Sequence, residues 1–283
     1  MTNKEANNDY IIAEEVKFLG KPIGDMFAEP KLQVSGYSNM KVELVSPTSA
    51  VAYMDWVNAA FYSSLCTWDK TPQEPVSDML ERFVMPEKEN LLFNILRDRP
   101  ISVATENVAF TFKMTNVPRS ITHQIVRHRN MAFGQQSYRV SSCYSDAVRI
   151  PQSLLDQHRW LPFQSADTCE GDKTAVAERL MDEFIETVKK CREVYRNLID
   201  FGIPMEQARN IMPMGTCTKI AVTMKLRDLI DYVKGRTGDI AMDEHTYLVC
   251  LMLKELKEKQ PDFFKVVKIF VPKCEETMSK YLK

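Results

Sequence analysis

The sequence predicts an α/β fold in which helix is the majority, and two patterns indicate this class. Apolar residues recur at helical spacing through most of the chain after residue 174, whereas shorter stretches nearer the start alternate with the period of two typical of strands. With 283 residues, 45% of them hydrophobic, the chain is long enough for a packed core. We expect residues 41–283 to form a single domain. Residues 1–40 are polar and mixed in charge, and we expect an N-terminal extension of unclear order.

The first half of the chain alternates between the two patterns. Residues 49–65 have helical spacing and begin at Ser49, a residue suited to capping a helix N-terminus. Residues 101–117 are rich in β-branched and aromatic side chains up to the break at Pro118. We therefore expect strands at 41–46 and 101–117, the latter as a strand or hairpin, and helices at 49–65, 85–98 and 120–131.

The second half is mainly helical. Residues 150–173 contain Pro, Ser, Asp and Gly and predict a loop, and a long helix at 175–201 should end at Gly202. A short helix at 204–212 should stop at Pro213. We expect two further helices, at 223–236 and at 239–259, with Asp239 as the cap of the second and Pro261 as its stop.

Charge and cysteine usage exclude several classes of protein. The 37 basic and 38 acidic residues give a net charge of −1, which argues against a general nucleic-acid or anionic-membrane binder. No apolar run reaches the length of a membrane span, and the first 30 residues lack the apolar core of a signal sequence. The seven cysteines form no C-x-x-C pair and the four histidines show no metal-ligand spacing. We expect a soluble, cytoplasmic protein with reduced thiols and no metal site.

The stretch HQIVRHRNMAFGQQSYRV, residues 123–140, concentrates cationic side chains beside apolar ones. It holds Arg127, Arg129 and Arg139, and a guanidinium offers a planar fork of donors that matches phosphate. An isolated arginine is more often a surface residue paired with an acid. Here the apolar neighbours leave few local acids, so these arginines predict a site for a small anion.

A second set of arginines follows at Arg209, Arg227 and Arg236. On one helix, Arg227 and Arg236 would point in different directions, so they could share one phosphate only if a second ligand or subunit took part. His128 stands between two arginines, whose like charge disfavours its proton, so we expect a neutral imidazole. A buried structural histidine is the alternative.

No nucleophile is convincing. Ser137 has no histidine base at a known spacing, and Cys143 and Cys217 each lack a recognisable partner. The chain also lacks the glycine-rich loops of Walker and Rossmann phosphate sites. These features are consistent with a bound organic cofactor that supplies reactivity while arginines hold its phosphates.

Three blocks in this order resemble the flavin-dependent thymidylate synthases, the ThyX family. The first is RHR at 127–129 followed by Ser137-x-Arg139, and it is preceded by FTFKMTNVPRSITHQIV. The second and third are GIPMEQARNIMP and MKLRDLIDYVKGR, and the similarity extends over about residues 41–265.

The resemblance implies a ThyX-like catalytic domain at 41–283, with an antiparallel sheet and long helices, in a homotetramer whose active sites draw on several subunits. It implies reductive methylation of dUMP to dTMP through FAD, with methylenetetrahydrofolate and NADPH as co-substrates. The residues that it places in the cofactor site are Arg127, His128, Arg129, Gln135, Lys225, Arg227 and Asp231. Those in the substrate site are Gln124, Arg127, Gln135, Gln136, Ser137, Tyr138, Arg139, Arg209 and Arg236. Arg236, against the pyrimidine edge, and Ser137 would be the catalytic residues.

Several positions depart from the pattern of the family. Lys225 stands where Asn is usual beside the flavin, Asp231 where Asn or His is common, and Ile101 and Asn107 where histidines are typical. Ala132 and Gly134 replace small polar residues within the signature. These changes leave two alternatives open. One is a divergent pyrimidine-nucleotide enzyme that hydroxymethylates carbon 5 or accepts dCMP, and the other is a flavin- or nucleotide-binding protein without turnover.

Overall fold

The structure is a computed structural model that describes residues 17–18, 21–22, 34–35, 39–49, 51–66, 78, 81–98, 103–144, 146–151, 173–237 and 243–282. The chain divides into two compact units, each built from several segments. Unit 1 comprises residues 1–40, 115–123 and 135–219, and unit 2 comprises 41–114, 124–134 and 220–283. The predicted single domain at 41–283 and the separate extension stay predictions.

The largest sheet has four strands in the order β4-β5-β8-β6. The fold class is α/β with an antiparallel sheet, as the sequence predicts. The four strands are β4 (Lys41–Ser46), β5 (Ala109–Pro118), β6 (Ala132–Gln135) and β8 (Cys217–Lys225). Alternate residues of β5 and β8 are buried, among them Phe110, Phe112 and Val222, which is why the period-two pattern is visible in the sequence.

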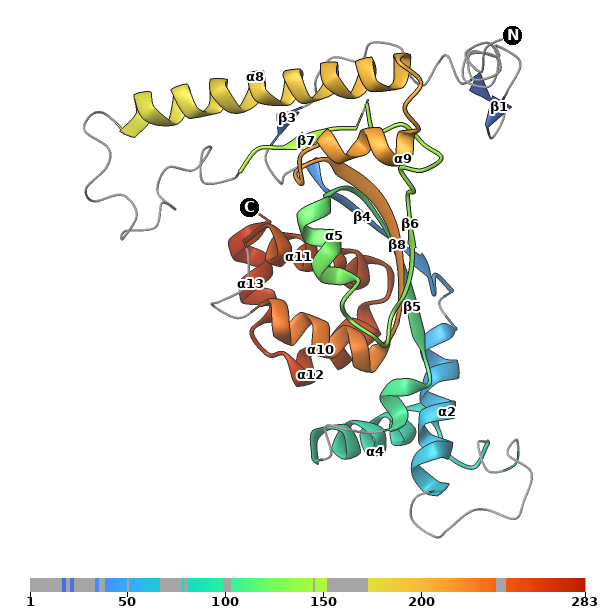
Figure 1. Ribbon diagram of the computed structural model, residues 1–283. Coiled ribbons are helices and arrows are strands. Elements are labelled where there is room, and N and C mark those ends of the chain that lie inside the picture. The colour runs from blue at the N-terminus through green and yellow to red at the C-terminus, as the bar shows by residue number, and fades with distance from the viewer. Residues whose placement is uncertain are drawn as a thin grey trace. The chain divides into compact units, whose positions relative to one another are not determined.

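In unit 2 the helices α10 to α13 gather on one face of this sheet (Figure 1). An aromatic cluster lies under them, in which the ring of Phe263 packs within 5.0–5.3 Å of the rings of Tyr53, Trp56 and Phe110. The helices of this unit are α2 (Ala52–Cys66), α4 (Met85–Asp98), α10 (Leu226–Arg236), α11 (Asp243–Lys259), α12 (Pro261–Phe270) and α13 (Cys274–Tyr281). The 3-10 turn η3 (Val103–Glu106) also belongs to it.

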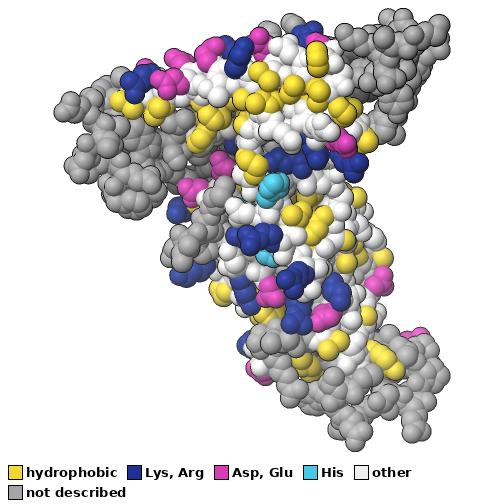
Figure 2. Space-filling view, viewed as in Figure 1, with side chains coloured by type: hydrophobic (Ala, Val, Ile, Leu, Met, Phe, Trp, Pro, Cys, Tyr) yellow, Lys and Arg dark blue, Asp and Glu magenta, His cyan; other side chains and the backbone are white. Residues whose placement is uncertain are grey.

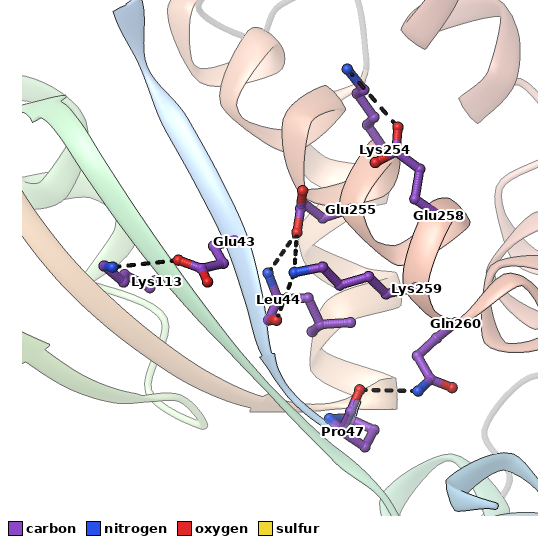
Figure 3. A network of polar contacts seen from close by, with 9 residues as sticks. All are labelled: Glu43, Leu44, Pro47, Lys113, Lys254, Glu255, Glu258, Lys259 and Gln260. Carbon is purple, nitrogen blue, oxygen red and sulfur yellow. Dashed lines mark hydrogen bonds and ion pairs between the residues drawn. The ribbon is translucent and has the colours of Figure 1, made fainter. Parts of the chain in front are cut away.

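Side chains of α11 bind the outer edge of β4 (Figure 3). The Glu255 carboxylate accepts a hydrogen bond from the Leu44 backbone N–H at 2.9 Å, and the Lys259 ammonium donates to the Leu44 carbonyl at 3.2 Å. Gln260 donates to the carbonyls of Pro47 and Ser49. The edge strand is thereby held to the helix, and part of its backbone is withheld from pairing with another strand.

Unit 1 is dominated by the long helix α8 (Lys173–Asp200). Figure 2 shows charged side chains along one edge of α8 and hydrophobic side chains along the neighbouring edge. The helix ends in a Schellman motif, because Gly202 has φ +94° and the Ile203 N–H donates to the Leu198 carbonyl at 2.9 Å. The shorter elements of this unit are β1 (Lys17–Phe18), β2 (Lys21–Pro22), β3 (Val34–Ser35), β7 (Val148–Arg149), α9 (Met205–Ala208) and η5 (Arg209–Ile211). The helix α5 (Arg119–Ile125) begins in unit 1 and ends in unit 2.

Most of the predicted elements are confirmed. The strand at 41–46 and the helix at 85–98 have the predicted bounds, and the long helix ends at Asp200, two residues before Gly202. The Ser49 hydroxyl accepts a hydrogen bond from the Val51 N–H at 3.3 Å, just before α2 begins at Ala52. The loop expected at 150–173 and the cap expected at Asp239 lie almost wholly outside the described residues.

Three predicted elements need correction. Residues 103–106 form a 3-10 turn, so the strand expected from residue 101 begins at Ala109. The helix expected at 120–131 ends at Ile125, and a turn follows. The helix expected from residue 223 begins at Leu226, because residues 217–225 form a central strand of the sheet. Pro261, expected as a stop, is also the first residue of α12, where its missing N–H costs no helical hydrogen bond.

None of the helices in the described ranges combines the length and apolarity of a bilayer span.

Candidate active site

The RHR stretch forms the turn that ends α5. The Arg127 N–H donates to the Gln124 carbonyl at 3.3 Å, and the His128 N–H donates to the Ile125 carbonyl at 3.0 Å. The side chains of Arg127 and Arg129 are exposed, and within the described part of the chain neither is ion-paired. Both guanidinium groups are thus accessible, and their role toward an anionic ligand stays a prediction.

His128 is held in one tautomer by Arg236, the last residue of α10. An Arg236 nitrogen lies 3.4 Å from Nε2 of His128, and because arginine can only donate, Nε2 is the acceptor and Nδ1 carries the proton. Burial and then the Arg236 charge lower the pKa of His128, against a smaller opposing effect of Asp228. The imidazole is neutral, as expected from the sequence, although burial and Arg236 are the causes rather than Arg127 and Arg129.

Gln124 contacts a buried pair of side chains. Its Oε1 lies 3.4 Å from Nδ1 of His245, and Nε2 of His245 lies 2.5 Å from the Tyr232 hydroxyl. His245 and Tyr232 are 0% and 1% exposed. The ring of Tyr232 also meets the edge of the His128 ring at a centroid distance of 5.1 Å. One buried tyrosine therefore adjoins two of the predicted site residues, directly or through His245.

The residues from 135 to 141 build a compact turn in unit 1. Gln135 donates to the Thr122 hydroxyl at 3.0 Å, and the Gln136 N–H donates to the Lys219 carbonyl at 2.9 Å. The Ser137 carbonyl accepts from the N–H groups of residues 140 and 141, and its hydroxyl accepts from the Arg139 N–H at 3.3 Å. Ser137 thus organises the backbone of this turn, and its role near a pyrimidine stays a prediction.

Arg139 and Arg209 meet at Glu206. The Arg139 Nε–H donates to the Glu206 carboxylate at 2.9 Å, whereas the Arg209 Nε–H donates to the Glu206 backbone carbonyl at 3.0 Å. Arg139 is 67% exposed at its side chain, so this ion pair is a weak surface contact that a bound phosphate could replace.

A cavity of about 330 Å³ lies within unit 1. Its lining residues are Arg119, His123, Tyr138, Arg209, Asn210, Met212, Pro213, Met214 and Thr216. The N–H groups of Arg119 and Ser120 donate to the carbonyls of Thr216 and Met214, both at 3.1 Å, which docks the start of α5 against the loop after η5. The cavity volume is near the lower end of the range for small-molecule sites, ~300–1,000 Å³.

Two arginines face this cavity, and among the described residues neither forms an ion pair. The Arg119 guanidinium stacks 4.1 Å from the centroid of the Tyr138 ring, and the Tyr138 hydroxyl donates to the Cys217 carbonyl at 2.6 Å. The tyrosine is thereby fixed and in turn orients Arg119. Sequence reasoning placed Tyr138 and Arg209 in the substrate site, and the structure places both on the wall of this cavity.

Sequence reasoning missed Arg119 and His123 as lining residues. Both lie in the segment PRSITHQ, which leads into the RHR motif and carries no motif of its own. The available signal was the spacing of four residues on a helix, which puts positions 119 and 123 on one face.

A second cationic cluster lies in unit 2 where β8 passes into α10. Glu106 accepts from Arg227 at 2.7 Å and from Lys225 at 3.2 Å. These hydrogen bonds, with that from Arg227 the stronger cause, lower the pKa of Glu106. Two cations share one carboxylate, so the cluster keeps a net positive charge. Asp231 is exposed on α10, Asn107 donates to the Ser63 hydroxyl at 3.1 Å, and Ile101 lies outside the described residues.

Comparison with known proteins shows the family to which the chain belongs. The family model described as thymidylate synthase complementing protein, Thy1, matches residues 49–262. A flavin-dependent thymidylate synthase of Geobacter sulfurreducens is 30% identical over 162 residues, 56% of this chain and 61% of the relative. A second, from Clostridium tetani, is 29% identical over 205 residues, 72% of this chain and 78% of the relative.

A solved structure shares the fold. The UMP/dUMP methylase PolB from Streptomyces cacaoi, bound with 5-Br dUMP, has a TM-score of 0.61 at 18% identity, over 83% of this chain and 96% of that one. Fold and family together define an enzyme of the flavin-dependent thymidylate synthase type. The chain belongs to the thymidylate synthase complementing protein family.

Proposed function

We propose that this chain binds FAD and methylates dUMP to dTMP, with methylenetetrahydrofolate as the carbon source and NADPH as the reductant. One observation carries the nucleotide part of the proposal. The cavity in unit 1 is lined by Arg119 and Arg209, and neither is ion-paired within the described ranges. Cationic donors without an acidic partner beside a cavity suit the phosphate of a small nucleotide.

Arg119 and Arg209 bind this phosphate in the proposal, and Arg139 adds a third donor once its contact with Glu206 is exchanged for the ligand. Tyr138 holds the Arg119 guanidinium over its ring, so little side-chain entropy is lost when the phosphate binds. The apolar lining residues Met212, Pro213 and Met214 exclude water from the bound nucleotide.

The donor set of unit 2 fits a flavin nucleotide. The Glu106–Lys225–Arg227 cluster carries a net positive charge suited to a diphosphate, with Arg127 and Arg129 as further donors. Gln135 and Asp231 are predicted flavin neighbours. When bound, FAD would supply the hydride that the methylation needs.

Arg236 and His128 are the groups that we assign to the reacting pyrimidine. The fixed charge of Arg236 stabilises negative charge that develops on the ring, which makes carbon 5 nucleophilic. His128 stays neutral and presents its Nδ1–H as a donor rather than as a general acid. No enzyme nucleophile is required, in agreement with the buried Cys143 and Cys217.

In the proposal the active enzyme is a homotetramer whose sites draw on more than one subunit. Arg227 and Arg236 lie at opposite ends of α10, nine residues apart. An α-helix turns 100° per residue, so these side chains leave its axis in opposite directions and would serve different ligands.

Visible absorption of the FAD-loaded protein tests the proposal. Addition of dUMP should perturb the flavin band, and turnover with methylenetetrahydrofolate and NADPH should yield a product heavier than dUMP by one CH₂, because a methyl group replaces a hydrogen. Perturbation by dCMP alone, or a product heavier by one further oxygen, would favour the divergent pyrimidine-nucleotide enzyme. Absence of flavin binding under any condition would contradict the proposal.

Replacement Glu106→Gln should weaken FAD binding about tenfold at pH 7, although it makes the cluster more positive. The reason is that Glu106 holds Lys225 and Arg227 side by side, and the neutral amide loses that hold. Since pairing lowers the pKa of Glu106, the effect of the variant should be reproduced in the unmodified protein only at a pH below its ordinary value of 4.5.

Quenching of flavin fluorescence on titration measures this affinity. Glu183→Gln is a matched control, because Glu183 is an exposed carboxylate that pairs with Arg179 on α8. Tighter FAD binding by the Glu106 variant would mean that the cluster acts through net charge and that positioning is unimportant.

A further inference from the structure

The cavity of unit 1 has basic side chains on its wall and no acidic ones. Of the described residues that line it, three are basic and none is an aspartate or a glutamate. In the proposed function Arg119 and Arg209 bind a phosphate there, whereas the third basic residue, His123, has no role. A polar side chain on the wall of an otherwise apolar cavity is a candidate for fixing the orientation of a ligand.

The hydroxyl groups of the wall are already engaged within the protein. The Tyr138 hydroxyl donates to the Cys217 carbonyl at 2.6 Å, and the Thr216 hydroxyl donates to the Pro213 carbonyl at 2.7 Å. A hydroxyl has a single proton, so neither side chain can donate to a ligand without giving up its internal hydrogen bond. The remaining side-chain donors of the wall are the basic residues and the amide of Asn210.

His123 lies one helical turn after Arg119 on α5. The spacing of four residues puts both side chains on one face of the helix, and both line the cavity. His123 is exposed, and within the described part of the chain its side chain has no hydrogen-bond or ion-pair partner. Its ring nitrogens are therefore accessible to a ligand, and in either neutral tautomer one of them carries an N–H.

The two arginines keep donors for the same ligand. A guanidinium carries several N–H groups, and only one of each is given to the backbone among the described residues. Arg119 donates to the Gln136 carbonyl at 3.4 Å, and Arg209 donates to the Glu206 carbonyl at 3.0 Å. A phosphate monoester presents three terminal oxygens as acceptors, so three basic side chains on one cavity wall match its needs.

We propose that His123 is a phosphate-binding residue that makes the cavity selective for a phosphorylated nucleotide over the free nucleoside. With Arg119 it supplies donors from α5, and Arg209 supplies donors from η5. The inference rests on the proposed function for the identity of the nucleotide. The phosphate contact itself can be probed without any nucleotide.

A series of side chains at position 123 tests this role. Isothermal calorimetry of the FAD-loaded protein measures affinity for dUMP and for deoxyuridine, which differ only in the phosphate. His123→Ala should weaken dUMP binding about tenfold, the effect of one lost charge-assisted hydrogen bond. His123→Gln keeps an N–H donor and should lie between His123→Ala and the unmodified protein. His123→Arg adds a permanent charge and should bind dUMP at least as tightly as the unmodified protein.

The affinity for deoxyuridine should change by less than about twofold across the series. Lys189→Ala, which removes an exposed cation paired with Glu186 on α8, is the control and should leave both affinities unchanged. Equal dUMP affinities of the three variants would overturn the inference. A parallel loss of dUMP and deoxyuridine affinity would also overturn it, because the imidazole would then act on the sugar, the base or the fold.

Inorganic pyrophosphate separates this inference from the proposed function, because it carries phosphate groups but no pyrimidine. With FAD in excess, pyrophosphate affinity should fall severalfold in His123→Ala, whichever nucleotide the enzyme uses. This fall in a protein that does not bind dUMP would remove the proposed substrate and leave the phosphate site in place. The same pyrophosphate affinity with and without His123 would overturn the inference, even if the unmodified protein binds dUMP.

Discussion

Replacing Arg119 and Arg209 together by alanine should weaken dUMP binding by about two to three orders of magnitude. A charge-assisted hydrogen bond contributes ~1.5–3 kcal/mol, so the loss of two donors corresponds to roughly 3–4 kcal/mol if their effects are partly coupled. Each arginine lines the cavity, and among the described residues neither has an acidic partner to which its charge is already committed. Calorimetry of the FAD-loaded protein measures the change.

Single substitutions separate the contributions of the individual arginines to dUMP affinity. Arg209→Lys keeps the charge but loses the fork of donors, so it should fall between the unmodified protein and Arg209→Ala. Arg139→Ala should have a smaller effect than either alanine variant, because Arg139 is 67% exposed and must first leave Glu206. Arg179→Ala on α8 is the matched surface control, with an ion pair at 3.8 Å. Unchanged dUMP affinity in the double variant would exclude the cavity as the phosphate site.

Most of the fold could be predicted from the sequence because its patterns are local. The apolar stripe of α8 is visible in the order of its residues. The positive φ that ends the helix is visible in the choice of glycine at position 202. The alternation in β5 is equally local, since its residues 110, 112 and 114 are all buried.

The missed boundaries lie where a local pattern was overridden by its surroundings. Residues 217–225 form a central strand of the sheet, and its last buried residue, Met224, is followed two positions on by Leu226, the first buried residue of α10, so the apolar pattern does not mark where the strand ends. The helix α5 stops at Ile125 although the apolar spacing continues, because the chain must turn there to enter the edge strand β6. Both outcomes depend on neighbours distant in sequence.

For the candidate site, the sequence revealed the chemical types but not their pairing. It singled out Arg139 and Lys225 as donors, and only the structure shows that each lies against a carboxylate. It predicted a helix at 239–259 but gave no sign that His245 would be buried in that helix. Pair formation is decided by tertiary contacts between segments more than 60 residues apart, and no spacing rule reports these.

Replacing Trp56 by alanine should destabilise unit 2 by about 4 kcal/mol and lower its melting temperature by roughly 10 °C. The indole is 2% exposed and packs against Phe263 at a centroid distance of 5.3 Å. Its Nε1–H donates to the Ala104 carbonyl at 2.8 Å, so truncation also removes a buried hydrogen bond. Differential scanning calorimetry measures the loss.

The same side chain links the core to the flavin cluster, since Ala104 belongs to the 3-10 turn that ends at Glu106. Trp56→Phe keeps most of the apolar contact but removes the donor, so it should cost only about 1–2 kcal/mol of stability and still weaken FAD binding severalfold. Phe263→Leu should lower stability more than FAD affinity. This variant disturbs the same aromatic cluster, but Phe263 makes no hydrogen bond to Ala104. If both variants lowered stability and FAD affinity in proportion, the turn would depend on the core as a whole, and the Trp56–Ala104 hydrogen bond would have no special role in placing Glu106.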